Sequence, residues 1–215
     1  MTTPRVLDID IILDAASDIL TNDGYQAVTL ASIASRCGAS TADVSSVFTT
    51  ANEVMVAMLS REFSGMYGVI VQNIESDPRG GLLSRLYTYM LSAVYERPLA
   101  KTLFVLDRDA LGSILRNSHS WAYMPTIAIR GELIAALQDA GMVRADVDAH
   151  MVASVLSACS AGLALTAPHD ELDLIIDGLS TMLARAVDAD VTDTTPGKAV
   201  FYEWATRLSV PSRDE

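Results

Sequence analysis

Apolar residues recur at helical spacing along almost the whole chain, and this feature constrains the fold most strongly. Residues three and four positions apart share one face of a helix, whereas a strand requires alternation with a period of two, which no long stretch shows. The first stripe faces away from Asp10, Asp14 and Asp18 and consists of Ile9, Ile12, Leu13, Ala16, Ile19 and Leu20. The 215 residues, half of them apolar, predict an all-α protein with one large domain or a small domain joined to a larger one.

The first fifty residues contain turn and capping signals for three short helices. Glycine ends helices and allows turns, while a Ser or Thr followed three residues later by an acid forms a capping box at a helix start. The signals, in chain order, are Gly24, Thr29, Gly38, the pair Ser40 and Asp43, and the pair Thr50 and Glu53, which opens a fourth helix. Three short helices joined by two turns are therefore expected within about fifty residues.

The fourth helix is predicted to be long. Its apolar stripe extends to about Ser76, which corresponds to roughly 35–40 Å at 1.5 Å per residue. Gly65 and Gly68 weaken its middle and would let it bend. After an acidic, turn-rich segment, DADVTDTTPG, a last amphipathic helix can dock on its own subunit, on a second subunit or on another protein. The helices expected in between cover 80–95, 99–116, 122–141, 147–166 and 170–188.

Composition and motifs exclude several classes of protein. No apolar run approaches the roughly 18 residues of a membrane span, and the N-terminus does not indicate a signal peptide. Cys37 and Cys159 lie far apart without metal-ligand spacing, which fits unpaired thiols in a reduced cytoplasm. His119, His150 and His169 lie in separate segments and no catalytic or phosphate-binding motif is present, so an enzyme, a metal site or a cofactor is not expected.

The charge is strongly acidic. The chain has a formal net charge of −12, so long-range attraction to DNA or to an anionic membrane is absent for the chain as a whole. Between residues 6 and 60, Arg36 is the single cation against seven acidic residues, a net charge of −6 (1 − 7). Phosphate contacts by cations supply most non-specific affinity for DNA, and this segment lacks them.

The first sixty residues nevertheless resemble the N-terminal domain of tetracycline-repressor-like (TetR family) regulators. The matching positions are Gly24, Tyr25, Thr29, Ile33, Ala34, Gly38, Ser40, Val44, Phe48, Glu53 and Val54. The resemblance implies a helix–turn–helix domain at 1–52, joined by a long fourth helix to a helical ligand-binding and dimerisation domain at 53–188. An acidic linker and a C-terminal amphipathic helix would follow at 189–215.

The segment that would read DNA departs from the family's pattern. The lysines that the family usually carries after the turn serine and at the start of the fourth helix are replaced by Thr41 and Ala51. Asp43 either completes the capping box with Ser40 or accepts a hydrogen bond from a cytosine amino group. The candidate DNA-binding residues that the resemblance implies are Thr29, Arg36, Ser40, Thr41, Ala42, Ser45, Ser46, Thr49 and Thr50.

Small residues four positions apart form a ridge in the segment 146–166. Such ridges let two helices approach closely, and the partner is either a helix of the same chain or the same helix of a second subunit. A parallel ridge contains Ser154, Ala158 and Gly162. The resemblance favours a homodimer, with interface candidates Ala149, Ala153, Ser157, Ala161, Leu172, Ile175, Leu179 and Met182.

Aromatic and Met side chains between the fourth helix and the dimer helices suit either a pocket for a hydrophobic small-molecule effector or an ordinary core. The resemblance implies a ligand cavity in this region. The candidate ligand-binding residues are Phe63, Tyr67, Tyr87, Met90, Phe104, His119, Trp121 and Tyr123.

Two functional hypotheses follow from the sequence. In the first, the chain is a ligand-responsive homodimeric repressor that binds operator DNA. Its autonomous DNA binding is weakened or lost because its N-terminal head, residues 6–60, contains a single cation. In the second, it does not bind DNA and acts through a protein partner or by sequestering a ligand. Retention of DNA at low salt distinguishes the two hypotheses.

Overall fold

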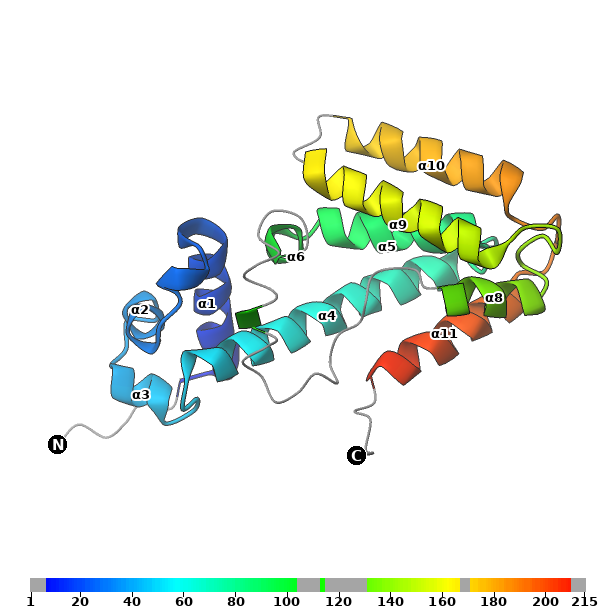
Figure 1. Ribbon diagram of the computed structural model, residues 1–215. Coiled ribbons are helices and arrows are strands. Elements are labelled where there is room, and N and C mark those ends of the chain that lie inside the picture. The colour runs from blue at the N-terminus through cyan, green and yellow to red at the C-terminus, as the bar shows by residue number, and fades with distance from the viewer. Residues whose placement is uncertain (1–6, 104–112, 115–130, 167–170, 210–215) are drawn as a thin grey trace. The chain divides into compact units, whose positions relative to one another are not determined.

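The computed structural model describes residues 7–103, 113–114, 131–166 and 171–209 (Figure 1). Apart from one isolated bridge between Val143 and Asp188, the regular structure in these residues is helical, which confirms the all-α fold. The chain divides into two compact units: Met1–Ser64 with Pro98–Trp121, and Gly65–Arg97 with Ala122–Glu215. The expected domain boundaries after residues 52 and 188 remain predictions.

The first unit contains the three short helices expected from the capping signals. The Asp8 side chain accepts a hydrogen bond from the N–H of Asp10 and so caps the first helix, which ends at Gly24 with φ 86°. The elements are α1 (Ile9–Asp23), η1 (Tyr25–Ala27), α2 (Leu30–Arg36) and α3 (Thr41–Ser45), with the short α6 (Pro98–Lys101) packed against α1. Fully buried apolar side chains hold them together: Ile12, Ile19, Leu20 and Ile33, with Val44 from α3.

The fourth helix is as long as predicted and is shared by both units. It is α4 (Ala51–Ser76), with residues up to Ser64 in the first unit and the remainder in the second. Among the described residues it is the one helix long and apolar enough to cross a membrane by length and composition, contrary to the expectation from the sequence. Its apolar stripe is buried inside the protein, including Val54, Met58 and Ile74 at 0% exposure, so α4 is a core helix.

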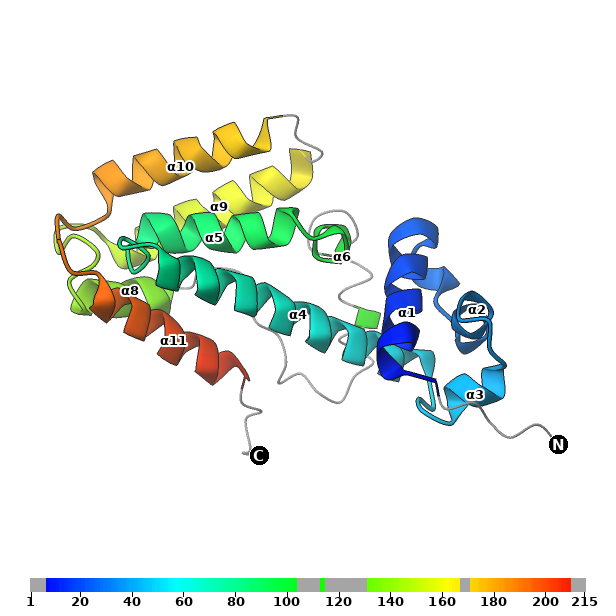
Figure 2. The ribbon, with the colours of Figure 1, turned by 180° about the vertical axis from the view of Figure 1, so that it is seen from behind.

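The second unit consists of longer helices. α5 (Leu83–Tyr95) packs against α10 (Leu172–Ala186), α8 (Gly131–Asp139) packs against α9 (Ala149–Thr166), and α11 (Thr195–Ser209) packs against α8. Figures 1 and 2 show α8 and α11 side by side from opposite directions. The terminal helix therefore docks on its own chain, which answers the question that the sequence left open.

Several expected helix boundaries differ from the structure by two or three residues. The helix predicted at 80–95 begins only at Leu83, because Gly80 and Gly81 form a turn in which their backbones approach other backbone atoms closely. The helices predicted at 99–116 and 122–141 are described only in part, as α6 and α8. Residues 104–112 and 115–130 of these segments lie outside the described part of the chain.

Candidate nucleic-acid interface, ligand lobe and dimerisation face

The helix–turn–helix of the first unit is held by side-chain caps. Thr29 Oγ1 accepts a hydrogen bond from the N–H of Ser32 (3.0 Å) at the start of α2. Ser40 Oγ accepts from the N–H of Asp43 (3.2 Å) at the start of α3, and Asp43 Oδ2 accepts from the N–H of Ser40 (3.0 Å). The predicted Thr29 cap and the predicted Ser40–Asp43 box each mark a helix start, and Asp43 has the capping role that the sequence allowed as one of two.

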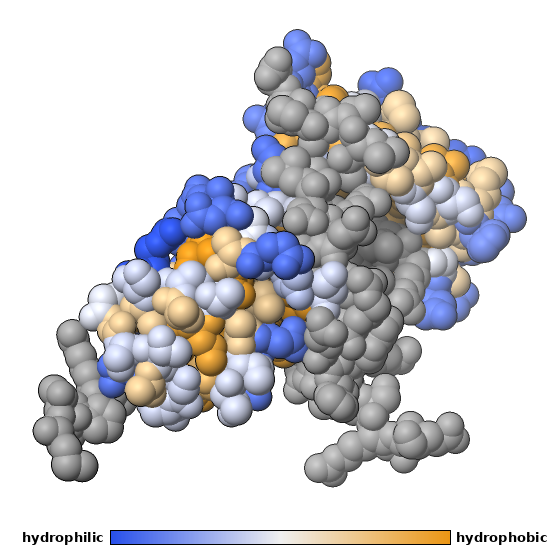
Figure 3. Space-filling view, turned by 60° about the vertical axis from the view of Figure 1, so that its left-hand side comes forward, coloured by the Kyte–Doolittle hydropathy of each residue, from blue (hydrophilic) through white to orange (hydrophobic). Residues whose placement is uncertain are grey.

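The exposed surface of this motif carries many hydroxyl groups and one cation, Arg36, among its predicted contacts. The predicted contacts Thr29, Ser40, Thr41, Ala42, Ser45, Ser46, Thr49 and Thr50 are all exposed. Several of their hydroxyls already serve the fold: Ser40 Oγ donates to Asp43 Oδ2 (2.7 Å) and Ser46 Oγ donates to the Asp43 carbonyl (2.6 Å). Figure 3 shows much of the visible face of the first unit in pale colours, near the middle of the hydropathy scale. Such a surface offers uncharged donors to a phosphate.

Arg36, the single cation among the predicted DNA contacts, is engaged in two ion pairs within the first unit. Its Nη1 lies against Asp18, and its Nη2 lies 2.9 Å from Asp23 Oδ2, so the guanidinium ties α2 to the C-terminal half of α1. Two carboxylates of the same chain thus satisfy the two terminal nitrogens of the guanidinium. A phosphate would have to compete with both carboxylates.

Arg61, which the sequence analysis did not single out, is engaged in the same way. Its Nη1 lies 3.1 Å from Asp10 Oδ1 and its Nη2 lies 2.6 Å from Asp14 Oδ1, which joins α4 to the N-terminal half of α1. The signal in the sequence was the spacing of Asp10 and Asp14, four residues apart on one exposed face of α1. Because these aspartates are separated from Arg61 by about fifty residues, only the folded chain reveals their partner.

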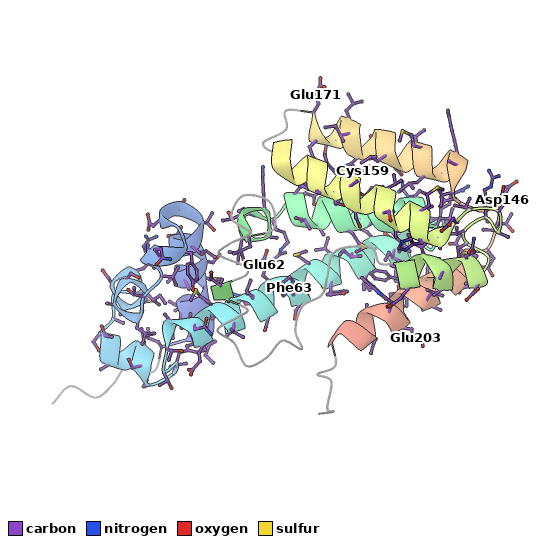
Figure 4. All side chains as sticks on the ribbon, in the orientation of Figure 1. Glu62, Phe63, Asp146, Cys159, Glu171 and Glu203 are labelled. Atoms are coloured by element: carbon purple, nitrogen blue, oxygen red, sulfur yellow. The ribbon has the colours of Figure 1, made fainter. Side chains whose placement is uncertain are left out.

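The predicted ligand-binding residues that the structure describes lie on α4 and α5. Phe63, on α4 (Figure 4), is buried in the first unit, whereas Tyr67, Tyr87 and Met90 belong to the second. Tyr87 is 3% exposed and its hydroxyl lies 3.3 Å from the Leu156 carbonyl and 3.0 Å from Ser160 Oγ, so it joins α5 to α9 as a core residue. The candidates outside the described residues are Phe104, His119, Trp121 and Tyr123.

Tyr67 differs from the other candidates. It lies on the second half of α4 and is half-buried, and burial raises the pKa of its phenol to about 12. Within the described residues its hydroxyl makes no hydrogen bond, in contrast to the hydroxyl of Tyr87. A partly desolvated phenol that the described part of the fold does not satisfy is suited to contact a ligand.

The small-residue ridge predicted for dimerisation is buried at one of its four positions. Ala153 is buried, and a Cβ at Gly131 of α8 would lie 3.9 Å from its methyl group, so this position faces α8 of the same chain. The parallel ridge is the exposed one, since Ser154, Ala158 and Gly162 all lie at the surface. Of the remaining candidates, Ser157 and Met182 are exposed, and the partly exposed ones are Ala149, Ala161, Leu172, Ile175 and Leu179.

Large apolar side chains accompany the exposed ridge. Met151 and Val155 on α9 are each 55% exposed, and Leu174 and Met182 on α10 are 65% and 62% exposed. We define these four residues with Ser154, Ala158, Gly162 and Gly178 as the α9–α10 face. Figure 4 labels Cys159 on α9 and Glu171 just before α10, which helps to locate the two helices. Large apolar side chains that are more than half exposed are typical of a protein–protein contact.

Similarity to known proteins is found at the level of structure alone. No protein-family model and no curated protein matches the sequence. The SmeT repressor of the Stenotrophomonas maltophilia multidrug efflux pump SmeDEF has a similar fold, with a TM-score of 0.59 and 18% identity over 86% of this chain and 93% of SmeT. SmeT has also been solved in complex with triclosan.

Two further regulators share the fold. The fatty acid degradation regulator FadR from Bacillus halodurans has a TM-score of 0.57 at 14% identity, over 85% of this chain and 96% of FadR. A TetR/AcrR-family regulator from Thermobifida fusca has a TM-score of 0.54 at 17% identity, over 83% of this chain and 97% of that protein. These neighbours are transcriptional regulators, not enzymes. The chain therefore has the fold of the TetR/AcrR family of transcriptional regulators, as the motif of its first sixty residues predicted.

Proposed function

We propose that the chain is a cytoplasmic, ligand-responsive transcriptional repressor that works as a homodimer and whose head binds duplex DNA only weakly by itself. The fold supports the regulatory role. We infer the weak DNA binding from the ion pairs that the arginines form within the chain. Arg36 and Arg61 are both paired with aspartates of α1, so the described residues 7–64 present no unengaged cation.

The consequence for DNA affinity follows from counterion release. Each phosphate that a protein neutralises contributes to affinity and steepens its dependence on salt by about 0.9 in the logarithmic slope. Hydroxyls such as those of Thr41 and Ser45, together with helix N-termini, bind phosphate without that contribution. Specific binding by this head would therefore depend on a dimer, on an additional partner, or on both.

The α9–α10 face supports the homodimer. Fully burying a Leu, Val or Met side chain contributes roughly 1.5–3 kcal/mol, and each subunit presents four such side chains that are more than half exposed. Exposed Gly162 and Gly178 would let the backbones of two subunits approach closely. A self-complementary patch with small and large apolar residues suits a two-fold symmetric contact.

The effector is proposed to be a hydrophobic small molecule that Tyr67 contacts in the second unit. A phenol with raised pKa donates a hydrogen bond throughout the physiological pH range, and its ring adds apolar contact. The neighbour SmeT binds triclosan, a ligand of this general kind. Removing the hydroxyl (Tyr67→Phe) should weaken binding of a phenolic or carbonyl ligand more than that of a purely apolar one.

The alternative function is regulation without DNA contact, through a protein partner or by ligand sequestration. The engagement of both arginines with α1 favours it. The two proposals share the fold and the α9–α10 face, and they differ in one measurable property, which is binding of duplex DNA by the purified dimer.

A lysine-restoration experiment tests the proposal. Thr41 is exposed and Ala51 is partly exposed, so both positions accept lysine. Fluorescence anisotropy with a labelled duplex from the chain's own genomic neighbourhood should give the wild type a Kd weaker than about 10⁻⁴ M at 0.15 M salt. Thr41→Lys/Ala51→Lys should bind the duplex at least about tenfold more tightly than the wild type at 0.05 M salt. The slope of its log binding constant against log salt concentration should be steeper by about 0.9 for each lysine that reaches a phosphate.

The control carries the same added charge away from the helix–turn–helix. Gln72 and Ala199 are exposed residues of the second unit, and Gln72→Lys/Ala199→Lys should leave affinity nearly unchanged. Equal gains in both double variants would show that net charge, not the position on the head, governs binding. Nanomolar binding of the duplex by the wild type at 0.15 M salt would refute the proposed weak head.

A further inference from the structure

The segment that follows α10 contacts the C-terminal end of α4 at several points, and we define residues 187–202 as the C-terminal strap. We propose that the strap is a positioning device that holds the last turn of α4 and the α4–α5 turn in place, so that the helix shared by both units has one fixed end. This inference goes beyond the proposed function and depends on neither DNA nor a ligand. It is argued from contacts within the second unit alone.

Two side chains of α11 hold the end of α4 directly. Lys198 Nζ donates a hydrogen bond to the backbone carbonyl of Glu75 (3.2 Å), and Tyr202 Oη donates to Glu75 Oε1 (2.5 Å). The last carbonyls of a helix have no partner inside the helix and carry partial negative charge, so a lysine there is favourable. Burial and the contact with Glu75 raise the pKa of Tyr202 to about 12, which keeps the phenol protonated as a donor.

The turn after α4 is held by Thr194 and by two glycines. Thr194 is buried, and its hydroxyl donates to the Pro78 carbonyl (2.8 Å) and accepts from the Gly81 N–H (3.4 Å). A Cβ at Gly197 would lie 2.1 Å from the Gly81 carbonyl oxygen, and one at Gly81 would lie 2.0 Å from the Thr194 carbonyl oxygen. The strap and the turn therefore touch backbone to backbone, which only glycine permits at these positions.

The other end of the strap is fixed as well. Asp188 accepts hydrogen bonds from the N–H (3.2 Å) and the hydroxyl (2.5 Å) of Ser84 at the start of α5. The Arg144 N–H donates to the Val187 carbonyl (2.9 Å), which ties the strap to the segment between α8 and α9. Phe201 anchors α11 in the core at 0% exposure. The strap is thus attached at both ends, and its contacts are suited to hold the last turn of α4 and the α4–α5 turn in place.

Amide hydrogen exchange of the full-length protein, followed by mass spectrometry, tests this restraint locally. In Tyr202→Phe the loss of one hydrogen bond to a carboxylate should speed exchange of peptides covering 72–82 by about fivefold. In Gly197→Ala the new methyl group must displace the backbone of Gly81, and exchange of the same peptides should rise by more than about tenfold. Peptides of α1 and of the middle of α9 should change less than about twofold in both variants.

Thr206→Ala is the matched control on α11, because the Thr206 hydroxyl donates only to the Tyr202 carbonyl within the same helix. It should leave exchange at 72–82 unchanged. A uniform rise in the exchange rate of all peptides in Tyr202→Phe would overturn the proposal, since it would reveal general destabilisation of the protein rather than local positioning of α4. Unchanged exchange at 72–82 in Tyr202→Phe would also overturn it. If Gly197→Ala does not fold, Tyr202→Phe decides alone, and neither result alters the expectations for DNA binding or dimerisation.

Discussion

Asp188 is one of three polar residues that are buried among the described residues, together with Ser84 and Thr194. Leu82, the residue before α5, provides no side-chain cap, and the Asp188 carboxylate replaces it by accepting the N–H of Ser84. Burial raises the pKa of Asp188 above its ordinary value of 3.8, although the hydrogen bonds from Ser84 oppose the shift. The cap therefore works against a desolvation cost.

The sign of this shift gives a pH prediction for Asp188. A raised pKa means that the folded state binds more protons than the unfolded state, so this group's contribution falls as pH rises from about 3.8 through the folded pKa and stays reduced at pH 7. Asp188→Asn keeps an acceptor for Ser84 and removes the buried charge. Relative to the wild type, the free energy of unfolding of Asp188→Asn should increase progressively between pH 3.8 and pH 7. At pH 7 it should be at least as large as that of the wild type.

Thermal unfolding of both proteins at a series of pH values measures that difference, in which the opposite contributions of other aspartates cancel. Asp188→Ala removes the acceptor and leaves the Ser84 groups unsatisfied, so it should lose about 1–3 kcal/mol at pH 7. If Asp188→Asn were as unstable as Asp188→Ala at pH 7, the charge itself would be needed, and attraction to Arg79 would outweigh desolvation.

At the residue scale, sequence reasoning succeeded where partners are close in the chain. The partners of the Ser40–Asp43 box are three positions apart, and a capping pattern contains all the information needed to predict it. Asp188 and Ser84 are 104 residues apart, and Arg61 lies 51 residues from Asp10. No local pattern marks such pairs, because their proximity is produced by the packing of whole helices.

Gly65 and Gly68 make α4 a test of helix propensity at the scale of one element. A Cβ at Gly68 would meet no atom within 4 Å, whereas a Cβ at Gly65 would lie 2.9 Å from Nη2 of Arg97. Gly68→Ala should therefore stabilise the protein by up to about 1 kcal/mol, and Gly65→Ala should gain less because the guanidinium must move. Chemical denaturation with an unchanged m-value measures both differences.

The comparison of these two variants isolates the contact, because both replace a glycine in the middle of the same helix by the same residue. Equal gains would show that the Arg97 side chain relocates at no cost. A loss in Gly68→Ala would contradict the open surroundings of this position, and it would point instead to a bend of α4 that alanine opposes.

At the element scale, helical period predicted the existence of α9 and α10 but not the direction in which each ridge faces. The ridges through Ala153 and through Ser154 have the same spacing and similar side chains, so their sequences do not distinguish them. The position of α8 decides the matter at Ala153, which is buried close to Gly131 of α8, whereas Ser157 of the same ridge is exposed. The orientation of a helix about its axis thus depends on a neighbour that local sequence does not specify.

The whole molecule combines an acidic net charge of −12 with an apolar face that is exposed to solvent in a single chain. Acidic charge keeps the protein soluble and does not compensate for the exposed side chains of the α9–α10 face. A second copy of the chain is the partner that this face suits best, because in a two-fold symmetric contact the same face of each subunit buries that of the other. A dimer would also place two helix–turn–helix domains on one assembly, and two linked weak sites bind more tightly than one.

Disruption of this face should produce a monomer. At about 10 µM, the wild type should elute with a light-scattering mass of twice 23.0 kDa, and Leu174→Glu/Met182→Glu should elute at 23.0 kDa. The two substitutions remove four large apolar contacts per dimer, roughly 6–12 kcal/mol at about 1.5–3 kcal/mol each, which is comparable to the approximately 8 kcal/mol of a micromolar Kd. Gln72→Glu/Ala199→Glu adds the same charge elsewhere on the second unit and should remain dimeric. A wild type of 23.0 kDa at this concentration would instead leave the face available to a different protein, and the regulatory proposal would then rest on that partner.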